Sequence, residues 1–134
     1  NYHVAVRHRN SLGVMTGSAQ ALNANAASID FTLPTTSTYG TAARATVNPG
    51  RMGQWCGNVV RDNLLKYTGG SNDRDPILVA VGSTLPTNTV NGYLPTDVTL
   101  DGVVKYTGTG NDRDPIILNV GGNTPNNTRT QQLP

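Results

Sequence analysis

A tandem repeat in the second half of the chain is the feature that most constrains the fold. The stretch DNLLKYTGGSNDRDPILVAVGS at 62–83 returns as DGVVKYTGTGNDRDPIILNVGG at 101–122. Copies 58–89 and 97–128 align without gaps at an offset of 39 residues, and about half of the aligned pairs are identical. Such a period occurs in solenoids, but two copies are too few to build one. We therefore expect the copies to form a pseudo-symmetric pair around one small core.

Each copy follows the same local plan. An Asp/Asn turn leads into a short apolar stretch (LLKY or VVKY), a glycine-containing loop and the sequence DRDP. ILVAVG and IILNVG then predict helices of barely two turns, with Pro76 and Pro115 in the first turn. Gly82 and Gly121 are expected to end them. The acids before each proline, which can cap the amino end, are Asp73, Asp75, Asp112 and Asp114.

The first 54 residues are expected to be rich in β-structure. The sequence YHVAVRHR alternates apolar and polar residues and predicts a strand at 2–9, and NSLG predicts a turn. Residues 14–22 form a candidate return strand and 27–33 a third strand, whereas 35–51 is predicted to be a long surface loop or an irregular edge. Three strands are few for a sandwich. We therefore expect a partial β-sandwich-like portion at 1–54, completed by upstream chain or a neighbouring subunit, followed by the repeat pair at 55–134.

The acidic residues point to an oxygen-ligand metal site in the second copy. All eight acids are Asp, and seven of them fall between Asp62 and Asp114. Calcium loops place ligands at positions 1, 3, 5 and 7, with a glycine at position 6. The second copy has this pattern, and a closing set follows after an insertion. The candidate ligands are Asp97, Thr99, Asp101 and the carbonyl of Val103, then Asn111, Asp112 and Asp114.

The first copy offers fewer charged ligands, so we expect weaker binding there or none. Its corresponding residues are Asn58, Asp62 and Leu64, then Asn72, Asp73 and Asp75. The alternative is purely structural, because Asp-Gly is a common turn dipeptide and Asp before a helical proline is a cap. In a small module without disulfides, a bound ion would add stability that the limited core cannot supply.

Other residues give weaker indications. Tyr67 and Tyr106 are expected to pack between the two halves, or alternatively to form an exposed pair for a partner or glycan. Cys56 is the single cysteine and is expected to be inert. A net charge of +2 gives no argument for nucleic acid, and no apolar run is long enough to span a membrane. No catalytic motif is present, so an enzyme is not expected.

The arrangement resembles the C-terminal region of large secreted and cell-surface proteins of Bacteroidetes. The resemblance rests on NYHVAVRHRNSLGVMT, on the two copies of KYTGxxNDRDPI and on the ending TRTQQLP, and it covers nearly the whole chain. The repeats also look like the paired calcium loops of dockerin modules. The resemblance implies extracellular placement, calcium and a role in assembly, with a fold that is mainly β with short helices and ends in two dockerin-like loop–helix repeats.

These observations predict a non-catalytic, secreted, calcium-stabilised structural or adhesive module at the cell surface. Its partner would be another protein or further copies of itself. The alternative is a subunit of an extracellular filament, a homopolymer assembled through β-strand complementation. The chain begins within a predicted strand, its β portion looks incomplete, and β-rich chains with free edges polymerise readily.

Overall fold

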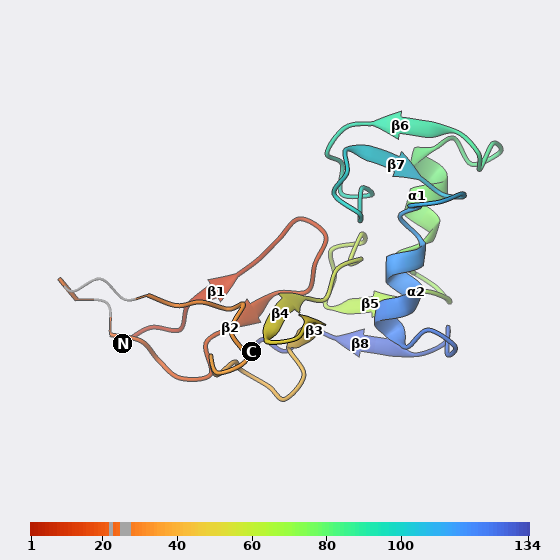
Figure 1. Ribbon diagram of the computed structural model, residues 1–134. Coiled ribbons are helices and arrows are strands. Elements are labelled where there is room, and N and C mark those ends of the chain that lie inside the picture. Colours follow the sequence, from red (N-terminus) through yellow and green to blue (C-terminus); the bar gives the residue numbers. More distant parts are fainter. Residues whose placement is uncertain (22, 25–27) are drawn as a thin grey trace.

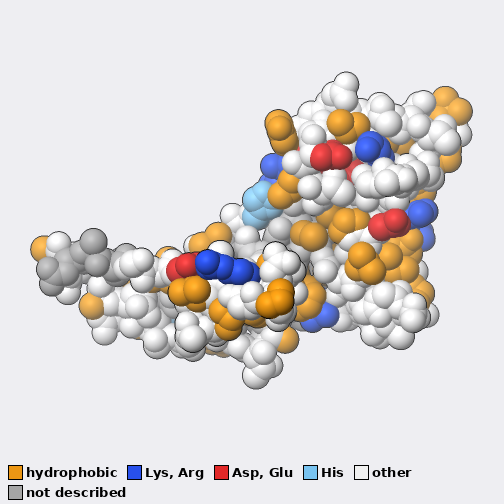
Figure 2. All heavy atoms as spheres, in the orientation of Figure 1, with side chains coloured by type: hydrophobic (Ala, Val, Ile, Leu, Met, Phe, Trp, Pro, Cys, Tyr) orange, Lys and Arg blue, Asp and Glu red, His pale blue; other side chains and the backbone are white. Residues whose placement is uncertain are grey.

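The computed structural model describes residues 1–21, 23, 24 and 28–134. The fold is mainly β with two short helices, and each sheet found in the described residues has two antiparallel strands. A narrow N-terminal portion leads into a broader body formed by the repeats (Figures 1 and 2).

The N-terminal portion holds two separate strand pairs. β1 (Ala5–Val6) pairs with β2 (Val14–Met15), so the first strand and its return are present but much shorter than 2–9 and 14–22. Residue 22 lies outside the described residues. A second pair consists of β3 (Arg44–Asn48) and β4 (Arg51–Gln54).

Two sequence predictions for this portion are wrong. Over 28–33 the chain forms no strand but bends, because the Asp30 carboxylate accepts bonds from the Thr32 N–H (2.8 Å) and hydroxyl (2.7 Å). Residue 27 of the predicted strand lies outside the described residues. The predicted loop 35–51 instead contains β3 and the start of β4, joined through Pro49 and Gly50, the latter at φ +74°. Asn-Pro-Gly is a turn signal, but the strands on either side are polar and lack the apolar alternation from which a hairpin would be predicted.

The repeats exchange strands with each other. The first copy provides β5 (Leu64–Lys66), α1 (Asp75–Ala80) and β6 (Thr89–Asn91), and the second provides β7 (Val103–Lys105), α2 (Asp114–Val120) and β8 (Thr128–Thr130). β5 pairs with β8 and β6 pairs with β7, so each sheet takes one strand from each copy (Figure 1). The hydroxyls of Thr68 and Thr107 repeat this exchange, since each donates to a proline carbonyl of the other copy. Each copy therefore completes the other.

The hydrophobic core has the symmetry of the repeat. Its buried members are equivalent pairs from the two copies, joined by Leu12 from the N-terminal portion. The pairs are Val59 and Val98, Leu65 and Val104, Ile77 and Ile116, and Val81 and Val120. Leu65, Val104, Ile77 and Ile116 are each 0% exposed. Because the helices are only about two turns long, this burial is what holds them in place.

The segment around Asn10 ties the N-terminal portion to both copies. The Asn10 carbonyl accepts bonds from the Gly57 and Asn58 N–H groups, and its side-chain amide donates to the Pro95 and Asp97 carbonyls. Gly57 has φ +107°, and a Cβ there would lie 2.8 Å from Ile116 Cγ1, so this close crossing requires glycine. The C-terminal tail also returns to the N-terminal portion, where the Gln131 side chain accepts a bond from the Gly13 N–H.

Candidate functional site

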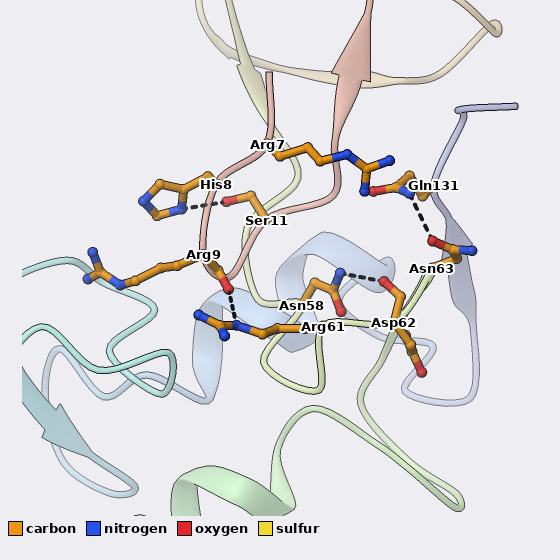
Figure 3. Close-up of a pocket in the computed structure, with 9 residues that line it drawn as sticks. All are labelled: Arg7, His8, Arg9, Ser11, Asn58, Arg61, Asp62, Asn63 and Gln131. Carbon is orange, nitrogen blue, oxygen red and sulfur yellow. Dashed lines mark hydrogen bonds between the residues drawn. The ribbon is translucent and has the colours of Figure 1, made fainter. Parts of the chain in front are cut away.

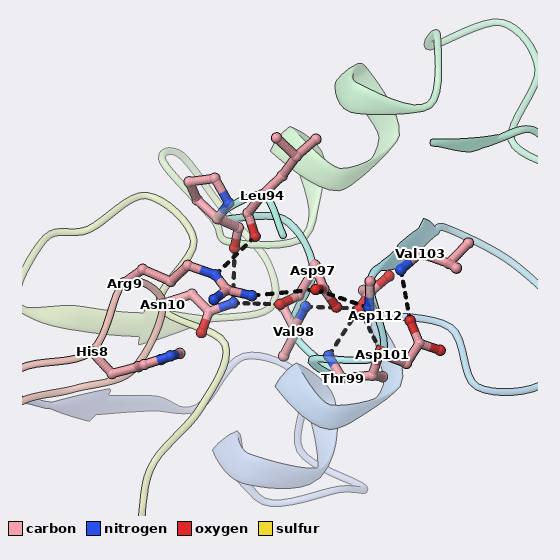
Figure 4. A network of polar contacts seen from close by, with 12 residues as sticks. His8, Arg9, Asn10, Leu94, Asp97, Val98, Thr99, Asp101, Val103 and Asp112 are labelled. Carbon is pink, nitrogen blue, oxygen red and sulfur yellow. Dashed lines mark hydrogen bonds and ion pairs between the residues drawn. The ribbon is translucent and has the colours of Figure 1, made fainter. Parts of the chain in front are cut away.

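The Asp112 carboxylate is the organising group of the second loop. It is fully buried and accepts bonds from the Val98 N–H (2.7 Å), the Thr99 N–H (2.9 Å) and hydroxyl (3.0 Å), and the Lys105 N–H (2.7 Å) (Figure 4). These donors lie on either side of the turn at 100–102, so one side chain closes the loop. Both carboxylate oxygens are therefore already occupied by N–H and O–H donors.

Asp73 is the equivalent residue of the first copy, but it is less well satisfied. It is also fully buried, and it accepts bonds from the Val60 N–H (3.0 Å) and the Lys66 N–H (2.8 Å). Loss of hydration on burial raises the pKa of Asp73 to about 6; the N–H bonds from Lys66 and Val60 counteract the rise, and the nearby Asp62 carboxylate adds to it.

The helix caps differ from the prediction. The Asn72 side-chain oxygen accepts the Asp75 N–H (2.9 Å), and its amide donates to the Asp75 carboxylate (2.8 Å). Asn111 and Asp114 repeat this arrangement at 3.0 and 2.8 Å. The prediction that Asp73 and Asp112 cap the helices is therefore wrong, because their carboxylates are bound to the loops instead. A side-chain amide can accept and donate at once, whereas a carboxylate can only accept.

Asp75 and Asp114 point outward rather than into the loops. Their side chains are 56% and 57% exposed and lie next to Arg74 and Arg113. The hydrogen bond from Asn72, and after it the bond and charge of Arg74, lowers the pKa of Asp75. Among the described residues their carboxylates accept no helix N–H, so the prediction that Asp75 and Asp114 cap the helices is also wrong. Each is bonded to the preceding asparagine, Asn72 or Asn111, and these four predicted ligands therefore lie apart from those of the loops.

The first position of each loop carries a buried acceptor without a partner. Asp97 is 0% exposed, and its Oδ2 accepts bonds from Arg9 and from the Gly102 N–H, both at 3.2 Å. Its Oδ1 has no hydrogen-bond partner, and neither has Asn58 Oδ1 at the equivalent position. Buried polar atoms without a partner are uncommon, so these two mark places where water or an ion would be stabilised.

The fifth position of each loop forms a local turn. The Asp101 carboxylate accepts the Val103 N–H (2.8 Å), and the Asp62 carboxylate accepts the Leu64 N–H (2.7 Å). Lys105 Nζ lies 3.9 Å from Asp101 Oδ2. The structure therefore joins Thr99 to Asp112 by direct bonds. The Asp97 carboxylate is bonded to Arg9 and the Gly102 N–H instead, and Asp101 lies at the edge of the same loop (Figure 4). Within residues 1–21, 23, 24 and 28–134, no group of three or more His, Cys, Asp or Glu side chains is placed to hold a metal ion.

Tyr67 and Tyr106 pack against the hydrophobic core and are half-buried. The guanidinium of Arg74 lies 5.2 Å from the centre of the Tyr67 ring, and that of Arg113 lies 5.2 Å from the centre of the Tyr106 ring. The repeated Tyr and Arg of KYTGxxNDRDP thus form one stacked pair in each copy. Their proposed role in partner binding stays a prediction.

Cys56 is partly buried beside α2. Its thiol and carbonyl accept bonds from the Asn119 amide at 3.2 and 2.8 Å. Burial raises the pKa of the Cys56 thiol, which disfavours the reactive thiolate.

Two features of the structure depend on contacts between distant residues and were not predicted from the sequence. The first is Arg9, whose ion pair with Asp97 joins positions 88 residues apart. The second is a pocket of about 320 Å³ between the N-terminal portion and the first copy (Figure 3). The dense run RHR at 7–9 was the available signal, since it concentrates cationic groups in one segment.

Comparison with known proteins found no match for the chain among family models, curated proteins or solved structures. In the part of the chain that the structure describes, neither helix has the length and apolar character needed to cross a membrane.

Proposed function

We propose that the chain is a non-catalytic structural module of a secreted, cell-surface protein, in which the dockerin-like repeat pair forms a compact body stabilised by calcium. One observation carries the structural role. The buried acid that recurs in both copies, Asp73 or Asp112, directs its carboxylate to the N–H groups of its own loop. Because these carboxylates are hydrogen-bonded to their own loops, their role in the proposal is to stabilise the loop conformation and not to take part in a reaction.

The second loop suits calcium better than the first, although the fit is partial. Asp97 Oδ1 is a buried carboxylate oxygen without a partner, and calcium prefers oxygen ligands of this kind. Asp97, Thr99 and Asp101 would hold the ion, with the Val103 carbonyl as a further candidate. Asp112 is already satisfied by four donors and would support the loop instead. The equivalent orphan in the first copy, Asn58 Oδ1, carries no charge and is expected to attract calcium less.

Calcium is expected to raise the melting temperature of the full chain. An ion bound with a dissociation constant near 0.1–1 mM, typical of extracellular modules, would add roughly 1.5–2.5 kcal/mol at about 10 mM calcium. That gain corresponds to a rise of about 5 °C or more for a domain of this size. Differential scanning calorimetry in calcium and in chelator measures it.

Two variants make this measurement specific. Asp97→Asn should abolish the difference between calcium and chelator, whereas Asp30→Asn, in the N-terminal portion, should leave it unchanged. Asp97→Asn also weakens the contact with Arg9, so the informative quantity is the calcium-dependent difference and not the melting temperature itself. Equal melting of the unmodified chain in calcium and in chelator would remove calcium from the proposal.

A second candidate function, a filament subunit built by strand complementation, is favoured by an apolar groove in the N-terminal portion. The groove is about 230 Å³ and lies beside β1; its lining includes Val6, Val14, Phe31 and Met52. β1 has no strand partner besides β2 among the described residues, and Val6 is 42% exposed. An added strand from a second copy would extend this pair and cover the groove, as in a partial sandwich that is completed from outside.

The filament candidate predicts fibres of the chain at high concentration by electron microscopy. Val6→Lys should prevent them, because a charge on an edge strand opposes strand addition. Val79→Lys, on the exposed face of α1, serves as the control and should still form fibres, since Val79 is 67% exposed and lies away from the groove. Monodisperse particles of the unmodified chain at every concentration would exclude this candidate.

A further inference from the structure

Arg9 forms the one ion pair of Asp97 within the described residues. Its Nη2 lies 3.2 Å from Asp97 Oδ2, and the Asp97 side chain is 0% exposed (Figure 4). The Gly102 N–H donates to the same oxygen, also at 3.2 Å, whereas Oδ1 has no partner. Charge-assisted bonds are usually about 2.7–2.9 Å long, so both contacts are long for a buried carboxylate. The charge of Asp97 is thus balanced by Arg9, while one of its two oxygens is unused.

The Arg9 side chain is held by the segment that precedes the second loop. Its Nε donates to the Leu94 carbonyl at 3.2 Å, and its guanidinium lies 5.7 Å from the centre of the Tyr93 ring. The side chain is still 27% exposed, so solvent is within its reach. The backbone is fixed separately, because the Arg9 carbonyl accepts the Arg61 Nε–H at 2.9 Å and the following residue, Asn10, is buried. The guanidinium can therefore leave the carboxylate while the backbone stays in place.

The first copy provides an internal comparison. Its equivalent loop position holds Asn58, which is buried but neutral. Among the described residues no basic side chain donates to Asn58, and Arg61 of that loop donates to the Arg9 carbonyl instead. A cationic side chain is thus placed at the loop whose first residue carries a charge and not at its neutral equivalent. This difference indicates that Arg9 is the counter-ion of Asp97.

We propose that Arg9 is an internal competitor of calcium in the second loop. The guanidinium balances Asp97 while the loop is free of ions, and calcium binding releases it. The inference rests on the proposed function, because it takes Asp97 as a calcium ligand. Calcium attracts carboxylate oxygens strongly, and its two positive charges would repel a guanidinium on the same buried group. Calcium would therefore loosen one contact between the N-terminal portion and the repeats.

Isothermal titration calorimetry of the full chain with calcium tests this competition. Arg9→Gln should bind calcium at least about fivefold more tightly than the unmodified chain, because a partly exposed ion pair no longer has to be broken. Arg7→Gln is the matched control. It removes the same charge from an exposed arginine of the same segment that forms no ion pair among the described residues, and it should leave the calcium affinity unchanged.

A second measurement uses the unmodified chain and does not depend on the folding of a variant. The NMR signal of the Arg9 Nε–H should shift during a calcium titration along the same binding curve as that of the Gly102 N–H. Exchange of the Arg9 Nε proton with water should also become faster, because the bond to the Leu94 carbonyl is lost when the guanidinium moves into solvent.

The outcomes separate this inference from the proposed function. If neither the unmodified chain nor Arg9→Gln binds calcium, the calcium site is absent and the inference fails with it. If the unmodified chain binds calcium and Arg9→Gln binds it with equal or lower affinity, the calcium site stands and the competition is disproved. Calcium binding that is detected only in Arg9→Gln would support the competition. Should Arg9→Gln not fold, an Arg9 Nε–H signal that saturating calcium leaves unchanged would overturn the inference.

Discussion

Asp112→Ala should destabilise the chain by about 4 kcal/mol at neutral pH, the largest effect expected of a single substitution here. The change removes a buried carboxylate and leaves the Val98, Thr99 and Lys105 N–H groups without their acceptor. Each buried donor left unpaired costs roughly 1–3 kcal/mol, and water entering the vacated space recovers part of that loss. Because small domains have only about 5–15 kcal/mol of stability in total, the variant should be close to unfolding.

The repeat supplies matched comparisons for this prediction. Asp73→Ala, at the equivalent position, should cost less, because Asp73 has fewer hydrogen-bond partners and its burial as an anion is itself unfavourable. Asp114→Ala removes an exposed carboxylate that supports the cap of α2, and its expected cost is about 1 kcal/mol or less. Urea denaturation in the presence of chelator measures all three without a contribution from bound ions.

The expected order of stability loss is therefore Asp112, then Asp73, then Asp114. If Asp112→Ala cost no more than Asp114→Ala, the buried carboxylate would not be holding the second loop, and the structural role proposed for the repeated acids would fail.

The local features of the repeats could be predicted from the sequence, whereas their assembly could not. Pro76 and Pro115 mark the first turns of α1 and α2, and the apolar runs before them became β5 and β7. Nothing in the sequence indicated that each copy pairs its strands with those of the other copy. Because the two copies are similar in sequence, β5 could pair with either β6 or β8, and only the three-dimensional path of the chain selects β8.

The candidate site also has features that could be predicted from the sequence and features that could not. The sequence singled out the acids repeated in the two copies, but it could not assign their roles. Asp73 and Asp75 stand two residues apart in one motif, yet the first is fully buried and the second is exposed. That difference depends on which way the chain turns before the helix. The partner of Asp97 lies 88 residues away, so no local pattern could have indicated Arg9.

In the N-terminal portion, local side-chain hydrogen bonds determined the backbone conformation where the alternation of apolar residues had predicted a strand. Ile29, Phe31 and Leu33 suggested a strand, but the bonds from Thr32 to Asp30 fold this segment into a turn. The reverse error occurred at β3 and β4, where polar residues form a hairpin. Alternation is a weak guide where strands are short and only partly buried.

Asp73 should make the stability of the chain depend on pH between about 4 and 6. Its pKa in the folded chain is about 6, raised chiefly by burial, against an ordinary value of 3.8. Between these values the folded state binds the proton more tightly than the unfolded state does. The stability contributed by protonated Asp73 is therefore fully present below pH 4 and is lost as the pH rises through 6.

The size of this effect follows from the two pKa values. A difference of roughly two units corresponds to about 3 kcal/mol. Asp30 and Asp75 act in the opposite direction, since their pKa values are lowered and they stabilise the folded chain above pH 4. The total stability of the chain against pH therefore combines opposing contributions, and Asp73 has to be isolated by difference.

Asp73→Asn isolates it, because the amide keeps the shape of the side chain and does not titrate in this range. The free energy of unfolding of the unmodified chain minus that of Asp73→Asn should be larger at pH 4 than at pH 7.5, by up to about 3 kcal/mol. Urea denaturation of both proteins at four or five pH values between these limits would trace the change, with its steepest part near pH 5. Asp75→Asn is the control: the pKa of Asp75 is lowered, so the corresponding difference should not decrease between pH 4 and 7.5. A difference between unmodified chain and Asp73→Asn that stays constant with pH would mean that Asp73 is hydrated in the folded chain, and the first loop would then be more open than its buried carboxylate implies.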